Sequence, residues 1–191
     1  MQRVIYVVLI ISFFACQEDK QPTNKALDAI PIDAAIIMES NDVTKSLKEL
    51  SKSAPWTLLT TQTSLEVNYQ KLLRYDSVLT SYASNLTSIN PLFISLHLTG
   101  AETLNWLVTT STKSQEQKFL LLNIGLKNFP NTKEQDYSNT IITEVRIEGD
   151  QLYYCMHMGL VFLSPEKILI QDAIRQLKTE NNLSANRSFQ N

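Results

Sequence analysis

The chain has 191 residues, of which 43% are hydrophobic and 19% charged, and its formal net charge is −2. This small charge and the absence of a basic stripe argue against a nucleic-acid partner. Two cysteines, two histidines and four glycines leave too few ligands for a metal cage and too few glycines for a phosphate-binding loop, so we expect neither metal nor cofactor.

The N-terminus has the composition of a secretory signal peptide. Arg3 provides one positive charge, and residues 4–14 are apolar except for Ser12. This apolar run is long enough for the core of a signal peptide and too short to cross a bilayer. The sequence therefore predicts export from the cytoplasm, with residues 1–15 as the segment that is removed.

The end of the apolar run indicates a lipid anchor. The tetrapeptide Phe-Phe-Ala-Cys that ends at Cys16 resembles the lipobox of bacterial lipoproteins, in which signal peptidase II cuts before a lipid-modified cysteine. Two or more acyl chains make such an anchor stable. The alternative is an ordinary secretory signal in which Cys16 is incidental. With Cys16 lipidated, Cys155 is the sole thiol of the mature chain and no internal disulfide can form.

The residues after the anchor form a polar tether, residues 16–25, without hydrophobic periodicity. The acidic pair Glu18-Asp19 resembles the surface-export signal of Bacteroidetes-type lipoproteins. We expect an outer-membrane lipoprotein of the cell envelope; exposure on the outer surface is favoured, and a periplasmic orientation stays open.

Hydrophobic periodicity predicts the elements of the body of the chain, residues 26–178. In chain order they are a buried strand at 34–38, a helix at 43–50 capped by Asp42, a helix starting at Pro55, a long helix at 65–86, strands at 92–98, 104–110, 118–125, 141–147, 152–158 and 160–163, and a closing helix starting at Ser164-Pro165.

The long helix gives the strongest pattern, because its apolar residues fall on one stripe. These residues are Leu65, Tyr69, Leu72, Leu79, Tyr82 and Leu86. The strands that follow are joined by short links, which favours antiparallel pairing. We predict an α+β fold, a mainly antiparallel sheet with amphipathic helices packed on one face. Residues 179–191 are predicted to be a polar, frayed tail. The chain ends without a closing element, so we expect the domain to be incomplete and to continue in a longer protein.

Three stretches carry a family resemblance. Residues 29–42, 95–100 and 159–165 are similar to the N-terminal region of a family of uncharacterised bacterial envelope proteins, described only as a domain of unknown function. The resemblance covers most of residues 26–178. It implies an envelope location and no established activity, cofactor or catalytic residue.

Histidine and cysteine offer two candidate sites. His97 lies in an apolar strand with Ser95 on the same face, and we expect it to be structural or to face solvent. Cys155 and His157 share one face of a strand, which is compatible with a metal ligand pair or with a nucleophilic cysteine. A buried, inert cysteine is the favoured reading of that pair.

Carboxylates and aromatic residues offer two more candidate sites. The acidic residues are scattered and fit caps, turns and solvated faces, although a pair like that of a glycosidase could meet in the fold. They are Glu39, Asp42, Glu102, Glu144, Asp150 and Glu166. Trp56 and Trp106, with Tyr153 and Tyr154, are candidates for an aromatic surface that binds a protein or glycan partner. The tripeptide Asp76-Ser77-Val78 resembles an acceptor motif for O-glycosylation in Bacteroidetes.

The residues therefore favour a non-catalytic, lipid-anchored envelope lipoprotein whose domain is a binding or structural module. Its partners would be the membrane, through Cys16, and a protein or a glycan. The alternative is an envelope hydrolase that uses scattered carboxylates or Cys155 with His157.

Overall fold

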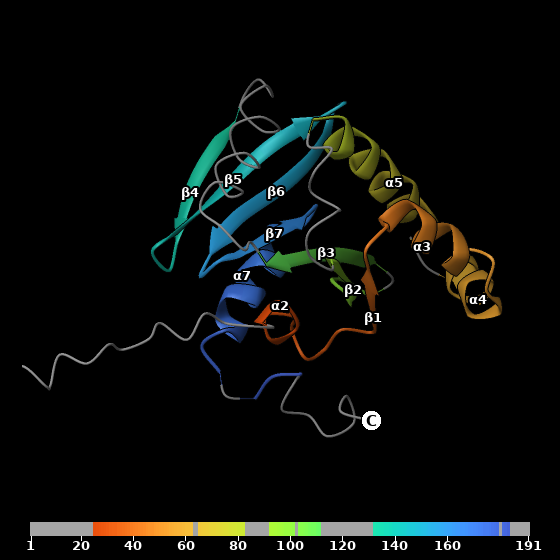
Figure 1. Cartoon of the computed structure of the whole chain (residues 1–191), viewed down its shortest axis with the longest axis horizontal. Helices are drawn as coiled ribbons and strands as arrows, with labels where there is room; N and C mark the ends of the chain where they lie inside the picture. The colour runs from red at the N-terminus through yellow and green to blue at the C-terminus, as the bar shows by residue number, and fades with distance from the viewer. Residues whose placement is uncertain are drawn as a thin grey trace, which may run out of the picture.

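The strands pair into one seven-stranded antiparallel sheet. The structure is a computed structural model, and it describes residues 25–62, 65–82, 92–101, 103–111, 132–179 and 181–183. Their order across the sheet is β1-β2-β3-β7-β6-β5-β4 (Figure 1). The bounds are β1 Ile36–Ser40, β2 Leu92–Leu98, β3 Leu104–Ser111, β4 Lys133–Tyr137, β5 Thr140–Ile147, β6 Asp150–His157 and β7 Leu160–Ser164. The predicted α+β class is confirmed.

Three tight turns determine how the second half of the sheet is connected. Each of the links β4–β5, β5–β6 and β6–β7 has two residues with positive φ, which is the backbone of a type I′ hairpin turn. They are Ser138 and Asn139, Glu148 and Gly149, and Met158 and Gly159. These turns make β4 to β7 one meander, and the pairing of β3 with β7 joins it to the antiparallel strands β1 to β3.

Five described helices flank the sheet, α2 Lys25–Asp28, α3 Val43–Leu50, α4 Ala54–Gln62, α5 Leu65–Tyr82 and α7 Lys167–Gln176. Asp42 caps α3 as predicted, since its Oδ1 accepts a hydrogen bond from the Lys45 amide at 2.9 Å. The closing helix begins later than predicted. Ser164 Oγ instead accepts a hydrogen bond from the Glu166 amide at 3.0 Å, and α7 begins at the next residue, Lys167.

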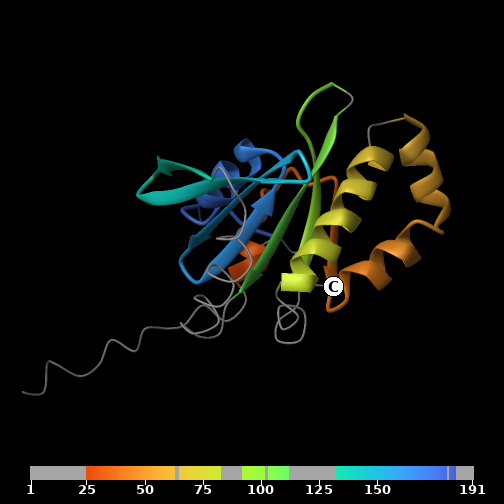
Figure 2. The ribbon, with the colours of Figure 1, turned by 90° about the horizontal axis from the view of Figure 1, so that it is seen from above.

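Helices α3, α4 and α5 form a layer on one face of the sheet, next to β1–β3 (Figure 2). Tyr69 and Leu72 of the predicted stripe are 8% and 5% exposed and pack in this first core cluster with Trp56. The Trp56 and Tyr69 rings meet edge to face at 5.0 Å between centroids. This part of the stripe is confirmed, and the side chains of Leu65, Leu79, Tyr82 and Leu86 lie outside the described residues.

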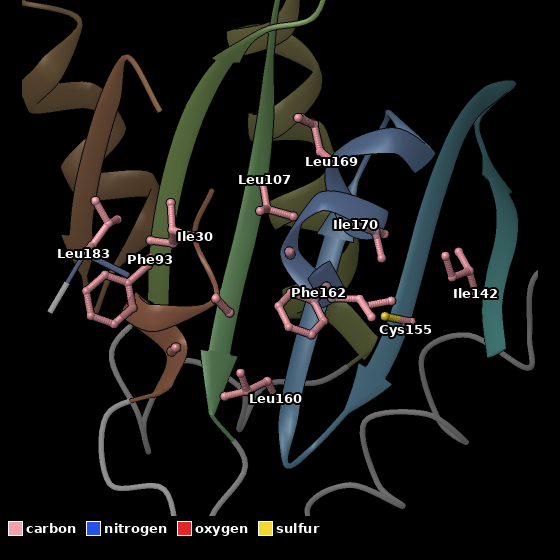
Figure 3. Packing of buried hydrophobic residues seen from close by; sticks show 14 residues of the cluster. Ile30, Phe93, Leu107, Ile142, Cys155, Leu160, Phe162, Leu169, Ile170 and Leu183 are labelled. Carbon is pink, nitrogen blue, oxygen red and sulfur yellow. The ribbon is translucent and has the colours of Figure 1, made fainter. Parts of the chain in front are cut away.

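The opposite face carries a second core cluster, covered by α2 and α7 (Figure 3). Phe93, Leu107 and Phe162 project on this face from the neighbouring strands β2, β3 and β7, Phe93 beside Ile30 and Leu183 and Phe162 beside α7. Helices thus pack on both faces of the sheet rather than on one, because the strands are apolar on both sides. Leu183 is 2% exposed in the same cluster, so the packed domain extends beyond residue 178 into the predicted tail.

Two further predictions need correction. The strand predicted at 34–38 is β1, and it forms an edge of the sheet with half-buried side chains instead of a buried strand. Strand β4 was not predicted, since its sequence Lys-Glu-Gln-Asp-Tyr has no apolar alternation.

The predicted strand at 118–125 and Cys16 lie outside the described residues. None of the described helices is long and apolar enough to span a membrane.

Candidate functional site

The outer edge of β1 is the most distinctive surface of the described residues. β1 ends the sheet and pairs with β2 alone, and no other described residue hydrogen-bonds to its outer backbone. Its side chains from Ile36 to Met38 are half-buried and apolar, and Glu39 is exposed. A row of backbone N–H and C=O groups therefore faces outward from an apolar strand, which is a template for pairing with another chain.

An apolar pocket lies beside this edge, between the sheet and the helix layer. Its volume is about 20 Å³, close to the smallest space that admits one water. Its walls come from β1, β2, α3, α4 and α5, and all are apolar or aromatic side chains: Ile36, Met38, Leu47, Leu50, Trp56, Tyr69, Leu72, Ile94 and Leu96. Such a space favours a small apolar group over water.

The segment around β1 is acidic. Residues 26–44 contain Asp28, Asp33, Glu39 and Asp42 and no lysine or arginine. Asp33 has 78% of its side chain exposed, and Glu39 is exposed as well. The edge of β1 is thus flanked by negative charge at both of its ends.

A polar chain ties the loop before β1 to the sheet. His97 Nε2 lies 2.8 Å from Ser95 Oγ, and Ser95 Oγ donates to the Leu107 carbonyl at 3.3 Å. The other ring nitrogen, Nδ1, is 3.4 Å from Asp33 Oδ1, which is an electrostatic contact longer than an ordinary hydrogen bond. Burial lowers the pKa of His97, and the charge of Asp33 offsets part of this effect.

The order Asp33, His97, Ser95 is that of an acid–base–nucleophile set, but the exposures are the reverse of what catalysis requires. Ser95 is 0% and His97 1% exposed, whereas Asp33 is in solvent. A substrate cannot reach a hydroxyl inside the sheet. These three side chains are therefore a structural link that positions the start of β1. Sequence reasoning found Ser95 beside His97 and missed Asp33, which only the fold brings near.

Cys155 and His157 do not form an activated pair. Cys155 is 1% exposed, lies among Ile142 and Phe162 (Figure 3), and burial raises the pKa of its thiol to about 12. His157 Nδ1 is instead 2.7 Å from Thr140 Oγ1. Burial, with a smaller contribution from the charge of Lys178, lowers the pKa of His157. The thiol is therefore protonated at neutral pH, and a buried, inert cysteine is what the geometry supports.

The carboxylates are held in separate local interactions. Asp150 pairs with Lys71 at 3.2 Å and with Arg74 at 3.3 Å, which ties α5 to the β5–β6 turn. Glu166 accepts a hydrogen bond from Asn105 Nδ2 at 3.3 Å. Glu102 lies outside the described residues.

Glu144 and Glu166 are the two carboxylates that the fold brings near one tyrosine. Burial raises the pKa of Tyr153, and the charges of Glu144 and Glu166 raise it further. No group of three or more His, Cys, Asp or Glu side chains in this part of the chain could hold a metal ion.

The predicted aromatic surface is wrong for the two tryptophans. Trp56 is 5% and Trp106 2% exposed, and both belong to the first core cluster. A ring covered on both faces has no surface left for a partner. The side chains of Asp76, Ser77 and Val78 on α5 lie outside the described residues.

Comparison with known proteins does not assign the chain to a group. No family model, no curated protein and no solved structure matches it.

Proposed function

We propose that this protein is a lipid-anchored lipoprotein of the outer membrane, whose domain binds a partner without chemically converting it. The observation that carries the binding part is the unpaired edge of β1 beside an apolar pocket. Soluble domains normally shield such an edge with charged residues, proline, bulges or a covering element. Among the described residues, β1 has none of these devices except Glu39, which favours a strand kept open for a partner.

The anchoring part rests on the N-terminal sequence. An apolar run that ends in Ala15-Cys16 is typical of a lipidated cysteine, and polar residues 17–24 precede α2. Even fully extended, this tether spans at most about 3.3–3.6 Å per residue. The domain would therefore work close to the membrane surface.

Metabolic labelling with palmitate tests the anchor. Wild-type protein should incorporate the label and sediment with membranes, and Cys16→Ala should do neither. Cys155→Ala is the matched control, because it removes the other cysteine of the chain and should label like the wild type. Equal labelling of the wild type and Cys16→Ala would overturn the anchor.

Site-specific crosslinking in cells tests the binding surface. A photoreactive residue at Glu39 on β1 should yield an adduct with one envelope component, and the same residue at Glu134 on β4 should yield none. Both positions are exposed residues of edge strands. The hydrolase would instead be supported if Glu144→Gln or Glu166→Gln lost an envelope phenotype at unchanged folded abundance and no adduct formed at Glu39.

A further inference from the structure

We infer that the partner of β1 is an extended polypeptide segment with basic ends, which adds to the sheet as an eighth strand beside β1. This inference rests on the proposed binding function and specifies its partner. It follows from three properties of the same edge, its backbone, its apolar side chains and its charge.

The backbone provides the pairing. β1 presents outward N–H and C=O groups over Ile36–Ser40, and no other described residue hydrogen-bonds to them. A segment that adopts extended conformation can satisfy these groups along the whole strand, as in other cases of strand addition. A glycan offers no such regular array of amides, so the backbone favours a polypeptide.

The side chains determine what the segment carries along its length. An added strand places alternate residues on the face of Ile36 and Met38, and those two side chains line the apolar pocket. The other residues fall on the face of Ile37, which packs against the second core cluster. Small apolar or β-branched residues on the added strand fit both environments.

The charge determines what lies at the ends of the segment. Asp33 precedes β1, and Glu39 and Asp42 lie at its end, while the first basic residue after them is Lys45 on α3. Lysine or arginine at the ends of an added strand would face carboxylates, which favours association and speeds it. A second copy of this chain would instead bring two acidic edges together, so self-pairing through β1 is disfavoured.

Peptide binding tests this inference with the full-length chain in detergent. The probe is a fluorescent peptide that alternates valine and threonine and has lysine at both ends, and its counterpart has glutamate at both ends. Fluorescence anisotropy should give about tenfold tighter binding of the lysine peptide, equivalent to about 1.4 kcal/mol, because the acidic ends of β1 attract lysine and repel glutamate. Glu39→Lys should reduce or invert the preference, and Glu134→Lys on β4 should leave it unchanged.

A second measurement does not depend on any variant. In the wild type, the lysine peptide should slow amide hydrogen exchange in residues 36–40 and leave residues 133–137 as they are. Equal binding of the two peptides, protection at β4 instead of β1, or a dimer that Glu39→Lys dissociates would overturn the inference. An adduct at Glu39 in cells without peptide binding would overturn it and leave the binding module standing, whereas loss of palmitate labelling would affect only the anchor.

Discussion

β1 and β4 end the same antiparallel sheet at opposite sides, but they are built from different residues. β4 has the sequence Lys-Glu-Gln-Asp-Tyr, and its first four side chains are exposed. β1 has the sequence Ile-Ile-Met-Glu-Ser, and only Glu39 is exposed. Charged residues along an edge discourage pairing with another chain, so β4 is protected by its own composition. β1 lacks this protection, and the contrast supports a binding role for one edge only.

The two strands also differ in what holds them. Ile36 and Met38 pack against the first core cluster and Ile37 against the second, so β1 is anchored on both faces. From β4, only Tyr137 packs against a core cluster, and its hydroxyl accepts a hydrogen bond from Arg175 at 3.0 Å. An open edge on a firmly held strand can bind a partner with little loss of conformational entropy.

The largest effect is expected at the helix layer that supports β1. Leu72→Asp places a charge in an apolar contact that is 5% exposed, and it should cost about 3 kcal/mol or more of the free energy of unfolding. Val67→Asp on the exposed side of the same helix, where the side chain is 60% exposed, should stay within about 0.5 kcal/mol. Urea denaturation measures both, and similar midpoints for the two variants would contradict the packing of α5.

Cys155 should matter for stability and not for chemistry. Cys155→Ser puts a hydroxyl in a site that is 1% exposed, at a cost of about 1–3 kcal/mol, and Cys155→Ala should cost less. In the native wild type, this thiol should resist alkylation at neutral pH, because its pKa is raised to about 12, and react after unfolding. Fast alkylation of the folded protein would contradict the buried environment.

Acidification should destabilise the fold, and His97, beside β1, should contribute more to this effect than His157, which lies nearer β4. The pKa values of His97 and His157 are lowered in the folded state, so the unfolded chain takes up protons first as pH falls. Their contribution to stability is present above about pH 6.5 and is lost progressively below it. His97→Gln should flatten this dependence more than His157→Gln, because His97 is only 1% exposed. Urea titrations at about pH 7.5 and 5.5 compare the slopes, and equal slopes in all three proteins would rule this out.

The smallest effect is expected at the ion pairs between α5 and the β5–β6 turn. Asp150→Asn removes the partner of Lys71 and Arg74, whose side chains are 30% and 51% exposed. Partly exposed pairs contribute little, so the loss should be about 0.5–1 kcal/mol and should decrease at high salt. Thermal unfolding at low and high salt measures it. A loss as large as that of Leu72→Asp would show that this contact, rather than the core, holds α5.

The predictions that succeeded depend on local patterns. The α5 stripe at Tyr69 and Leu72 and the Asp42 cap follow from residues a few positions apart, whose geometry a helix determines by itself. β4 failed the same reasoning, since an exposed edge strand has no apolar period to detect.

The predictions that failed concern which surface a residue meets. Trp56 and Trp106 have the composition of a binding surface, yet they lie in the core because helices cover that face of the sheet. Asp33 approaches His97 only when the loop before β1 folds back onto β2. Sequence alone also gave no sign that helices would cover the second face.

The sequence by itself determined the α+β class, most of the element order and the candidate lipid anchor at Cys16, because periodicity, caps, turns and a signal segment are properties of neighbouring residues. Only the tertiary structure decided that β1 is an edge, that its flanking carboxylates line one open strand and that Ser95, His97 and Cys155 are closed to solvent. The physical reason is that burial and exposure depend on which elements pack together. That packing is determined by contacts between residues far apart in the chain.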